Sequence, residues 1–415
     1  MASGSGASRI IALDALRGFA VMGILAMNII AFSMPEMAYI SPRIYGGENL
    51  ADLIAWSLSF LLIDGKMRGL FSLLFGASMI LIADRAAASG QSAVSVHYRR
   101  MAWLALFGLC HFLFLWWGDI LFLYAAVGSV AFLMRGWSHQ RLIRWAIGLY
   151  ALGTLVMTIL MGSSLVSIRI GESAGASSEQ VELAQEMRAE YSLTDEEIDE
   201  EVAFYRSDYW TITADQFANV SDLLVGVAWS FLETLPLMML GMALFRSGFL
   251  VGGRERAIYW RSVAAFLVPG FLLTLALLWV EWRTGFDPVI GVNIFAAWGM
   301  PARLMMTIGY AALLLLLIGR YAQSGWMMRV AAAGRAAFTN YLGTSLVMTF
   351  IFYGYGLGLF GAVPRAELYL FVLGAWALML LWSKPWLDHF RYGPLEWLWR
   401  CLAQGKWVPL RRGNA

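Results

Sequence analysis

Residues 10–33 read IIALDALRGFAVMGILAMNIIAFS, an apolar block with three polar interruptions, Asp14, Arg17 and Asn28. A helix of this length rises about 36 Å, which is enough to cross a hydrocarbon core of roughly 30 Å. Arg17 and Asn28 lie eleven residues apart and therefore share one stripe of that helix. Ionisable groups within a span are costly and usually face a partner, a cavity or a substrate path. The block therefore predicts an integral membrane protein with a polar interior.

The rest of the chain repeats this pattern and predicts an all-α, polytopic transmembrane helix bundle. Apolar types supply 60% of the 415 residues and charged types only 14%, whereas soluble proteins carry about 25% charged residues. We expect ten spans, near residues 10–33, 67–84, 101–117, 120–134, 144–167, 222–245, 262–280, 303–319, 337–360 and 367–383. Two shorter apolar stretches, 51–63 and 290–300, are interpreted as half-helices or interfacial helices before the second and eighth spans.

The distribution of basic residues predicts the orientation of the bundle. With the N-terminus inside, 21 of the 30 lysines and arginines fall in inner segments, so the positive-inside rule places both termini in the cytoplasm. The expected organisation is an N-terminal half with five spans (1–168), an acidic extracytoplasmic insertion (169–221), a C-terminal half with five spans (222–390) and a basic cytoplasmic tail (391–415).

The insertion 169–221 carries 13 acidic residues against three arginines. Capping boxes at Ser177-x-x-Gln180 and Thr194-x-x-Glu197 predict the starts of two short acidic helices. The insertion could be a lid, a partner surface, a cation-attracting rim, or a solvated segment without chemistry.

Several kinds of site are excluded by residue type or context. The two cysteines, Cys110 and Cys401, are too far apart in the predicted topology to form a disulfide. Four scattered histidines give no metal-ligand pattern, so we expect no metal and no permanently bound cofactor. Gly356-x-Gly358-x-x-Gly361 follows no strand, so it fails as a dinucleotide fingerprint and is interpreted as a place of close helix packing.

Polar residues at membrane depth are the candidate functional residues. Asp14 and Arg17 are spaced i, i+3, which permits an ion pair that either anchors the inner end of the helix or takes part in binding. Asn28 either bridges helices by hydrogen bonds or contacts a substrate. Glu233, near the midplane of the sixth span, could relay protons, position a hydroxyl group or pair with Arg17.

His111 lies in the outward half of the third span and is followed by Trp116-Trp117-Gly118-Asp119. A turn lies between them, so Asp119 could approach His111 and tune it as a general base. The alternative is a histidine that forms a hydrogen bond with a neighbouring helix. The double tryptophan is interpreted as part of an interfacial aromatic belt.

Two further polar groups lie on other spans. Asp64, Lys66 and Arg68 cluster at the outward mouth of the second span. They could clamp a carboxylate, a phosphate or a sugar, or could extend to the lipid headgroups. Asn340 and Tyr341 add polar groups to the inner half of the ninth span.

Several motifs together carry a resemblance to a known family. They are ALDALRGFA at 12–20, GKMRGLFSLLFG at 65–76, GDIL at 118–121 within 111–124, and C-terminal motifs at 334–342, 352–361 and 393–400. With these motifs the chain resembles the YeiB family of bacterial inner-membrane proteins, which have a domain of unknown function. The resemblance covers nearly the whole chain apart from the acidic insertion, and it implies a multi-pass protein of the cytoplasmic membrane.

The YeiB family is in turn similar to the transmembrane acyltransferase superfamily, which includes OafA-type O-acyltransferases and the heparan glucosaminide N-acetyltransferase. These enzymes pass an acyl group from cytosolic acyl-CoA to a sugar on the far side of the membrane. OafA-type enzymes have a histidine eleven residues after the arginine of the first span, where this chain has Asn28, as the glucosaminide enzymes do. The glucosaminide enzymes use a histidine in the following loop, but residues 34–50 contain none. Both positions of the superfamily's histidine are therefore empty.

The resemblance implies transfer of an acyl group from acyl-CoA, as a co-substrate, to an extracytoplasmic sugar or lipid acceptor. His111 is then the best remaining base, with Asp119 as its orienting partner and Arg17 near the acyl-CoA entrance. Asn28 or Lys66 would hold the oxyanion that forms on the thioester.

Two other classes of function stay open. A transporter or flippase on the same scaffold would use Glu233, His111 and Asp119 as a proton path. Lys66 and Arg68 would then bind an anionic solute or lipid headgroup. A non-catalytic envelope protein would act through the acidic insertion. The lipid bilayer is the expected partner, the glycine-rich spans would also allow a homo-oligomer, and no nucleic-acid partner is expected.

Overall fold

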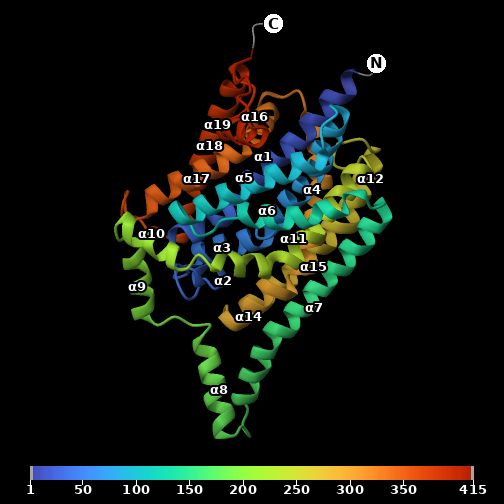
Figure 1. Cartoon of the computed structure of the whole chain (residues 1–415). Coiled ribbons are helices and arrows are strands. Elements are labelled where there is room, and N and C mark those ends of the chain that lie inside the picture. The colour runs from blue at the N-terminus through green and yellow to red at the C-terminus, as the bar shows by residue number, and fades with distance from the viewer. Residues whose placement is uncertain (1–2, 413–415) are drawn as a thin grey trace.

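The computed structural model describes residues 3–412, with side chains from residue 11 onward, and is built from helices (Figure 1). Ten helices correspond to the predicted spans: α1 (Ser3–Ser33), α4 (Lys66–Ala88), α5 (Ala93–Phe114), α6 (Leu121–Ala131), α7 (His139–Gly171), α11 (Asp222–Arg246), α13 (Val268–Arg283), α15 (Met300–Tyr321), α17 (Ala337–Phe352) and α18 (Arg365–His389). Shorter helices connect or extend them: α2 (Met37–Ile40), α3 (Leu50–Leu62), α8 (Ser178–Ala189), α9 (Asp195–Tyr205), α10 (Tyr209–Ala218), α12 (Arg256–Ser262), α14 (Pro288–Asn293), α16 (Gly325–Arg335) and α19 (Pro394–Gln404).

Seven helical segments of the described chain are long and apolar enough to cross a membrane. They are Ile11–Ser33, Leu50–Ala88, His139–Gly171, Asp222–Arg246, Arg256–Arg283, Met300–Tyr321 and Arg365–His389. The other three predicted spans are α5, α6 and α17, of which α6 and α17 are shorter apolar helices. The fold is therefore a polytopic helical membrane bundle, as the hydropathy pattern predicts.

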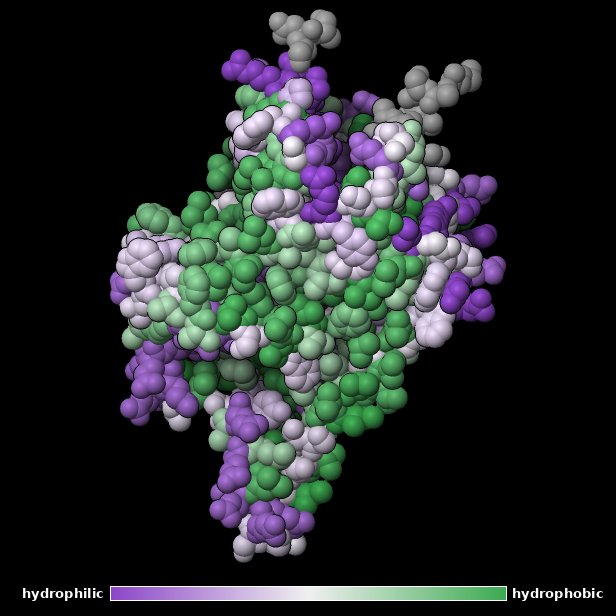
Figure 2. All heavy atoms as spheres, viewed as in Figure 1, coloured by the Kyte–Doolittle hydropathy of each residue, from purple (hydrophilic) through white to green (hydrophobic). Residues whose placement is uncertain are grey.

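The start of α1 and the segment after α19 lie at one end of the bundle, and the acidic helices α8 and α9 lie away from them (Figure 1). An even number of crossings returns the chain to the side on which it began, so this arrangement agrees with ten spans. The face shown in Figure 2 is mostly apolar between its hydrophilic extremities. The stretches 51–63 and 290–300 form short helical segments before α4 and α15, as predicted.

The ninth predicted span is shorter than expected. α17 ends at Phe352, eight residues before the predicted limit, because the glycines that follow have low helix propensity. Gly358 and Gly361 adopt positive φ angles of 68° and 69°, which a turn requires. Their interpretation as helix-packing positions is therefore wrong. Gly354 closes the turn against the insertion, where its N–H donates to the carbonyl of Tyr205 at 3.0 Å.

Both predicted capping boxes of the insertion are present, at Ser177 and Thr194. They start α8 and α9, the two expected helices. A third helix that the sequence analysis missed, α10, begins at Tyr209 after the cap residue Asp208. The hydroxyl of Tyr209 donates to the carbonyl of Phe114 at 3.0 Å. The insertion therefore covers the outer end of α5.

Glycines set the distance between α4 and α11. A Cβ atom at Gly76 would lie 2.0 Å from the carbonyl oxygen of Met238, and one at Gly241 would lie 2.0 Å from that of Leu73. Small residues at such positions let two helix backbones approach closely. This contact fixes the polar side chains of α4 relative to those of α11.

Candidate functional site

A histidine–aspartate pair lies where α5 turns into α6. The turn follows Phe114, and α6 begins at Leu121. Nδ1 of His111 lies 2.8 Å from Oδ1 of Asp119, and Oδ2 accepts a hydrogen bond from the N–H of Phe122 at 2.7 Å. Both side chains of the pair are fully buried. The prediction that this turn brings His111 and Asp119 together is confirmed.

The second ring nitrogen of His111 is free. Among residues 11–412, Nε2 has no hydrogen-bond partner, and neither do the indole N–H groups of Trp116 and Trp117. An unpaired buried polar group costs about 1–3 kcal/mol, so a group of them indicates a place for water or a polar ligand. A carboxylate can accept a hydrogen bond only from a protonated Nδ1, so Asp119 orients the ring with Nε2 directed away from the pair. A histidine oriented in this way by a carboxylate is a candidate general base.

Aromatic rings surround the pair. Trp116 stacks on Phe32 with ring centroids 3.9 Å apart and is only 2% exposed, so its assignment to an interfacial belt is wrong. The rings of Tyr341 and His111 lie 5.3 Å apart. The hydroxyl of Tyr341 donates to a carbonyl of the α5–α6 turn and accepts from an N–H of the same turn, each at 3.3 Å. Tyr341 therefore holds the turn that carries Asp119.

A small crevice lies beside these rings, between α1 and α17. Asn28 and Phe32 line it from α1, and Tyr341, Thr344 and Ser345 line it from α17. Its volume is about 10 Å³, which is room for about one water molecule. The amide of Asn28 forms no hydrogen bond with any side chain or backbone group that the structure describes. Asn28 is therefore not a bridge between helices in this conformation.

Asn28 and His111 both lie in the half of the bundle away from the start of α1, which the predicted orientation makes the outer half. Asn28 is 17 residues from Ile11, where the apolar part of α1 begins, and His111 is 18 residues from Ala93, where α5 begins. At 1.5 Å per residue, these separations correspond to about 25–27 Å of helix. The site therefore lies closer to the end of the bundle that carries α8 and α9 than to the end at which α1 begins.

The predicted pair of Asp14 and Arg17 is confirmed, with a distance of 2.9 Å between Oδ1 and Nη1. Arg17 also donates to the hydroxyl of Ser78 at 2.8 Å and so ties α1 to α4. Arg17 lies eleven residues from Asn28, about 16 Å along the helix axis. The ion pair therefore belongs to the inner half of the bundle and not to the site around His111.

A second polar cluster surrounds Glu233 in the middle of α11. Its carboxylate pairs with Arg68 of α4 and with Arg303 of α15, the latter at 3.2 Å, and accepts a hydrogen bond from Tyr150 at 3.4 Å. Of the three roles considered for Glu233, pairing with Arg17 is wrong, because Glu233 faces the first turns of α4 and α15. Two cations and a hydroxyl group compensate its buried charge, as a buried carboxylate requires.

The predicted clamp of Asp64, Lys66 and Arg68 does not form. Asp64 accepts a hydrogen bond from the hydroxyl of Tyr39, and the Nζ of Lys66 donates to the carbonyl of Phe60. Arg68 points instead to α11. Lys66 is 1% exposed, so it does not extend to the headgroups either. The break between α3 and α4 gives each of the three side chains a different neighbour.

Arg303, Tyr150 and Tyr124 also belong to this cluster, although their sequence positions did not predict it. The hydroxyl of Tyr124 lies 3.0 Å from that of Ser72 and donates to the carbonyl of Arg68 at 3.3 Å, which joins α6 to α4. The tyrosines gave no signal, because they are frequent at membrane boundaries. Arg303 did give one, since an arginine at the outer end of a span departs from the positive-inside rule.

Asn340 has a role in helix packing. Its amide nitrogen donates to the carbonyl of Ala333 at 3.0 Å and to the hydroxyl of Ser383 at 3.2 Å. Its oxygen accepts from the indole of Trp382 at 2.9 Å. These bonds join α16, α17 and α18. The two neighbouring candidates thus act separately, with Asn340 in packing and Tyr341 beside the histidine.

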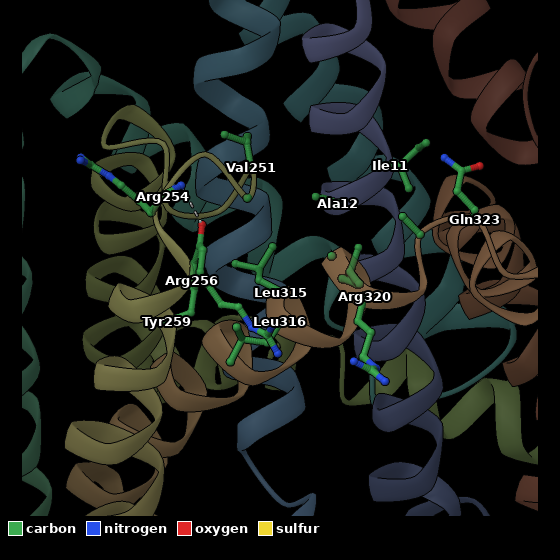
Figure 3. Close-up of a pocket in the computed structure, with 14 residues that line it drawn as sticks. Ile11, Ala12, Val251, Arg254, Arg256, Tyr259, Leu315, Leu316, Arg320 and Gln323 are labelled. Atoms are coloured by element: carbon green, nitrogen blue, oxygen red, sulfur yellow. Dashed lines mark hydrogen bonds between the residues drawn. The ribbon is translucent and has the colours of Figure 1, made fainter.

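A separate pocket of about 570 Å³ opens at the inner end, between α1, α12 and α15 (Figure 3). Arg254, Arg256 and Arg320 line it, together with Tyr259 and apolar residues of α1 and α15. Within the part of the chain that the structure describes, no acidic residue lines this pocket.

Comparison with known proteins agrees with the sequence motifs. Residues 244–406 match the family model "Protein of unknown function (DUF418)". The uncharacterized protein YeiB of Escherichia coli strain K12 is 32% identical over 407 residues, which cover 95% of this chain and 96% of the relative. The chain belongs to the YeiB family.

The family extends beyond one bacterial group. The uncharacterized protein YxaH of Bacillus subtilis strain 168 is 31% identical over 414 residues, covering 97% of this chain and 96% of the relative. An uncharacterized 39.9 kDa protein of Bacillus acidopullulyticus is 23% identical over 404 residues, with coverage of 97% and 96%. No solved structure matches the chain. The names of these YeiB-family relatives assign no activity, so function must be argued from the site.

Proposed function

We propose that this YeiB-family protein is an acyltransferase of the bacterial inner membrane. It transfers an acyl group from cytosolic acyl-CoA to a sugar or lipid acceptor on the extracytoplasmic side. One observation supports this more than any other. The His111–Asp119 pair is buried and oriented as a base, and its Nε2 has no partner among residues 11–412.

The chemistry follows from this orientation. Nε2 of His111 takes the proton of the acceptor hydroxyl or amine, whose oxygen or nitrogen attacks the thioester carbonyl carbon. The carbon–sulfur bond then breaks, and the imidazolium returns the proton to the departing thiolate. The products are the acylated acceptor and free CoA. Asp119 keeps the imidazole oriented and stabilises its charged form.

The oxyanion that forms on the carbonyl needs hydrogen-bond donors nearby. The indole N–H groups of Trp116 and Trp117 have no partner in the described chain, and Asn28 lines the crevice beside these rings. We assign the role of donor to the amide of Asn28 and the indole of Trp116. The rings of Trp116 and His111 lie 6.2 Å apart. Lys66 is not available for this role, since its Nζ donates to the carbonyl of Phe60.

The cluster around Glu233 favours acyl transfer over proton-coupled transport. A carboxylate that relays protons must exchange them with water in every cycle. Glu233 is only 9% exposed, and Arg68, Arg303 and Tyr150 occupy its oxygens. A proton-carrying role would require these pairs to open each time.

The test is acyl transfer by the purified protein in detergent. Radiolabelled acetyl-CoA and longer acyl-CoA species are supplied together with a bacterial envelope extract, and CoA thiol release and labelled product are measured. His111→Gln should lower the rate by about 10²–10⁴-fold, because it removes the base. Asp119→Asn should lower it similarly, because the amide would donate to Nδ1 and leave the proton on Nε2.

His97→Gln is the matched control. His97 lies on the same helix, is buried, contacts the carbonyl of Gly128 at 3.2 Å and stacks on Phe132 at 3.8 Å. Its substitution should leave the rate unchanged in the protein that stays folded. A rate that does not depend on His111 contradicts the assignment of the base. A folded wild type that transfers no acyl group from any donor contradicts the proposed function itself.

A further inference from the structure

The pocket at the inner end of α1 gathers positive charge from two separate segments. Arg254 comes from the turn before α12, Arg256 is the first residue of α12, and Arg320 comes from the last turn of α15. Figure 3 shows Arg256 and Arg320 on the two sides of the pocket, with Ala12 of α1 between the segments. Arg254 lines the pocket as well, but its side chain points away from it in Figure 3, so Arg256 and Arg320 are the two guanidinium groups on its sides.

This charge is not balanced within the described chain. None of the ion pairs formed by residues 11–412 involves Arg254, Arg256 or Arg320. Arg320 donates only to the hydroxyl of Tyr321, at 3.2 Å. Like charges that line one cavity raise its positive potential, and an anion in the cavity lowers it.

The positive-inside rule explains why inner segments contain arginine. It does not explain why arginines from two segments line the same pocket. Arg261 shows the difference. It is exposed, as Arg254, Arg256 and Arg320 are, and it lies on the same helix as Arg256, but it does not line the pocket. An arginine that serves only to orient the protein in the membrane does not need to line a pocket. The position of two arginines on one pocket therefore requires another reason.

The walls of the pocket are already ordered. Ala12, Leu315 and Ile318 are each at most 5% exposed. The hydroxyl of Tyr259 donates to the carbonyl of Phe249 at 2.8 Å and accepts from the N–H of Arg254 at 3.4 Å. The turn that carries the first arginine is therefore fixed by a buried tyrosine.

We propose that this pocket binds a phosphate group at the inner membrane surface, with Arg256 and Arg320 as its ligands. Guanidinium groups bind phosphate oxygens by paired, charge-assisted hydrogen bonds. The volume of about 570 Å³ exceeds that of a phosphate alone and lies in the usual range of about 300–1,000 Å³ for small-molecule sites. The apolar walls accommodate the rest of the ligand, so its class is a phosphate ester with an apolar or extended part.

Two sources can supply such an ester. One is an anionic phospholipid of the inner leaflet, and the other is a soluble phosphate ester of the CoA type. This proposal does not depend on acyl transfer, because it rests only on the charge and shape of the pocket. A failure of the transfer assay therefore leaves this proposal in place.

The test measures binding to the full-length protein in a maltoside detergent, which carries no phosphate. The probes are short-chain phosphatidylglycerol for the lipid source and desulfo-CoA for the soluble source. At least one should bind saturably. Arg256→Gln and Arg320→Gln should each weaken binding by about tenfold or more, the loss of one hydrogen bond to a charged group. Arg261→Gln is the matched control on the same helix and should bind as the wild type does.

The outcomes separate clearly. Binding of phosphatidylglycerol alone assigns the site to a lipid, and binding of desulfo-CoA alone assigns it to a soluble ester. Either result, with loss in Arg256→Gln and not in Arg261→Gln, supports a phosphate site. Arg256→Lys keeps the charge and should retain part of the affinity, which guards against a fault in folding. The absence of saturable binding of both probes, or an equal loss in Arg261→Gln, overturns the proposal.

Discussion

The contact between α4 and α11 gives a sharp test of the fold through Gly76→Ala. The added Cβ would lie 2.0 Å from the carbonyl oxygen of Met238 and 2.8 Å from its carbonyl carbon, whereas ordinary contacts begin at 3.4 Å. The atoms in the way belong to the backbone, so no side chain can rotate to make room. The two helices must therefore move apart. This movement would also break the close contact that Gly241 of α11 makes with the backbone of α4.

The expected cost can be bounded from known packing energies. Overpacking of a closely packed contact costs about 1–3 kcal/mol, and the better helix propensity of alanine returns up to about 1 kcal/mol. We therefore expect Gly76→Ala to lower the free energy of unfolding by roughly 1–2 kcal/mol. Gly162→Ala on α7 is the matched control, because a Cβ there has no neighbour within 4 Å. It should raise stability by about 0.5–1 kcal/mol.

The assay is reversible unfolding in mixed detergent micelles, followed by loss of helical signal, for the wild type and both variants. The structure predicts opposite signs for the two substitutions. If Gly76→Ala is as stable as Gly162→Ala, the backbones of α4 and α11 are not in contact, and the argument fails at its first step.

Three further predictions concern other parts of the molecule. Glu233→Gln leaves the buried Arg303 and the partly buried Arg68 without their carboxylate and should cost about 3–5 kcal/mol in the same assay. An unchanged protein would contradict the ion pairs. Thr194→Ala removes the capping oxygen of α9 and should cost about 0.5–2 kcal/mol, seen as faster amide exchange in that helix only. Burial raises the pKa of the carboxyl groups of Glu36 and Glu201 above their ordinary value of 4.5, and the N–H of Glu36 donates to Glu201 at 2.9 Å. This contribution to stability is present below pH 4.5 and is lost as pH rises through the raised pKa values. Protection of the Gly354 amide from hydrogen exchange should therefore fall over that range. Glu201→Gln should remove most of this pH dependence, and an equal dependence in the wild type and the variant would exclude Glu36 and Glu201 as its source.

Features set by nearby residues could be predicted from the sequence. His111 and Asp119 are eight residues apart across one turn, so few arrangements of that turn keep them separate. The capping boxes at Ser177 and Thr194 depend on residues three positions away. The spans follow from hydropathy, because a bilayer demands apolar segments of a fixed minimum length.

Contacts between distant helices could not be predicted in the same way. Glu233 pairs with Arg303 across 70 residues and with Arg68 across 165 residues. The partners of Glu233 depend on how the helices pack against one another. Close backbone contacts at positions such as Gly76 determine this packing. The early end of α17 was missed for another reason. Hydropathy counts apolar residues and ignores the low helix propensity of the glycines after Phe352.

The two polar clusters of the outer half differ in how completely their hydrogen bonds are satisfied. Around Glu233, both carboxylate oxygens have partners, and the bonds join α4, α7, α11 and α15. Around His111, both carboxylate oxygens of Asp119 have hydrogen-bond partners, whereas Nε2 of His111 has none among the described residues. A polar group that is buried away from bulk water and has no partner raises the free energy of the folded protein. A ligand or a bound water can remove this penalty. The first cluster therefore holds helices together, and the second is the place at which to look for an acceptor.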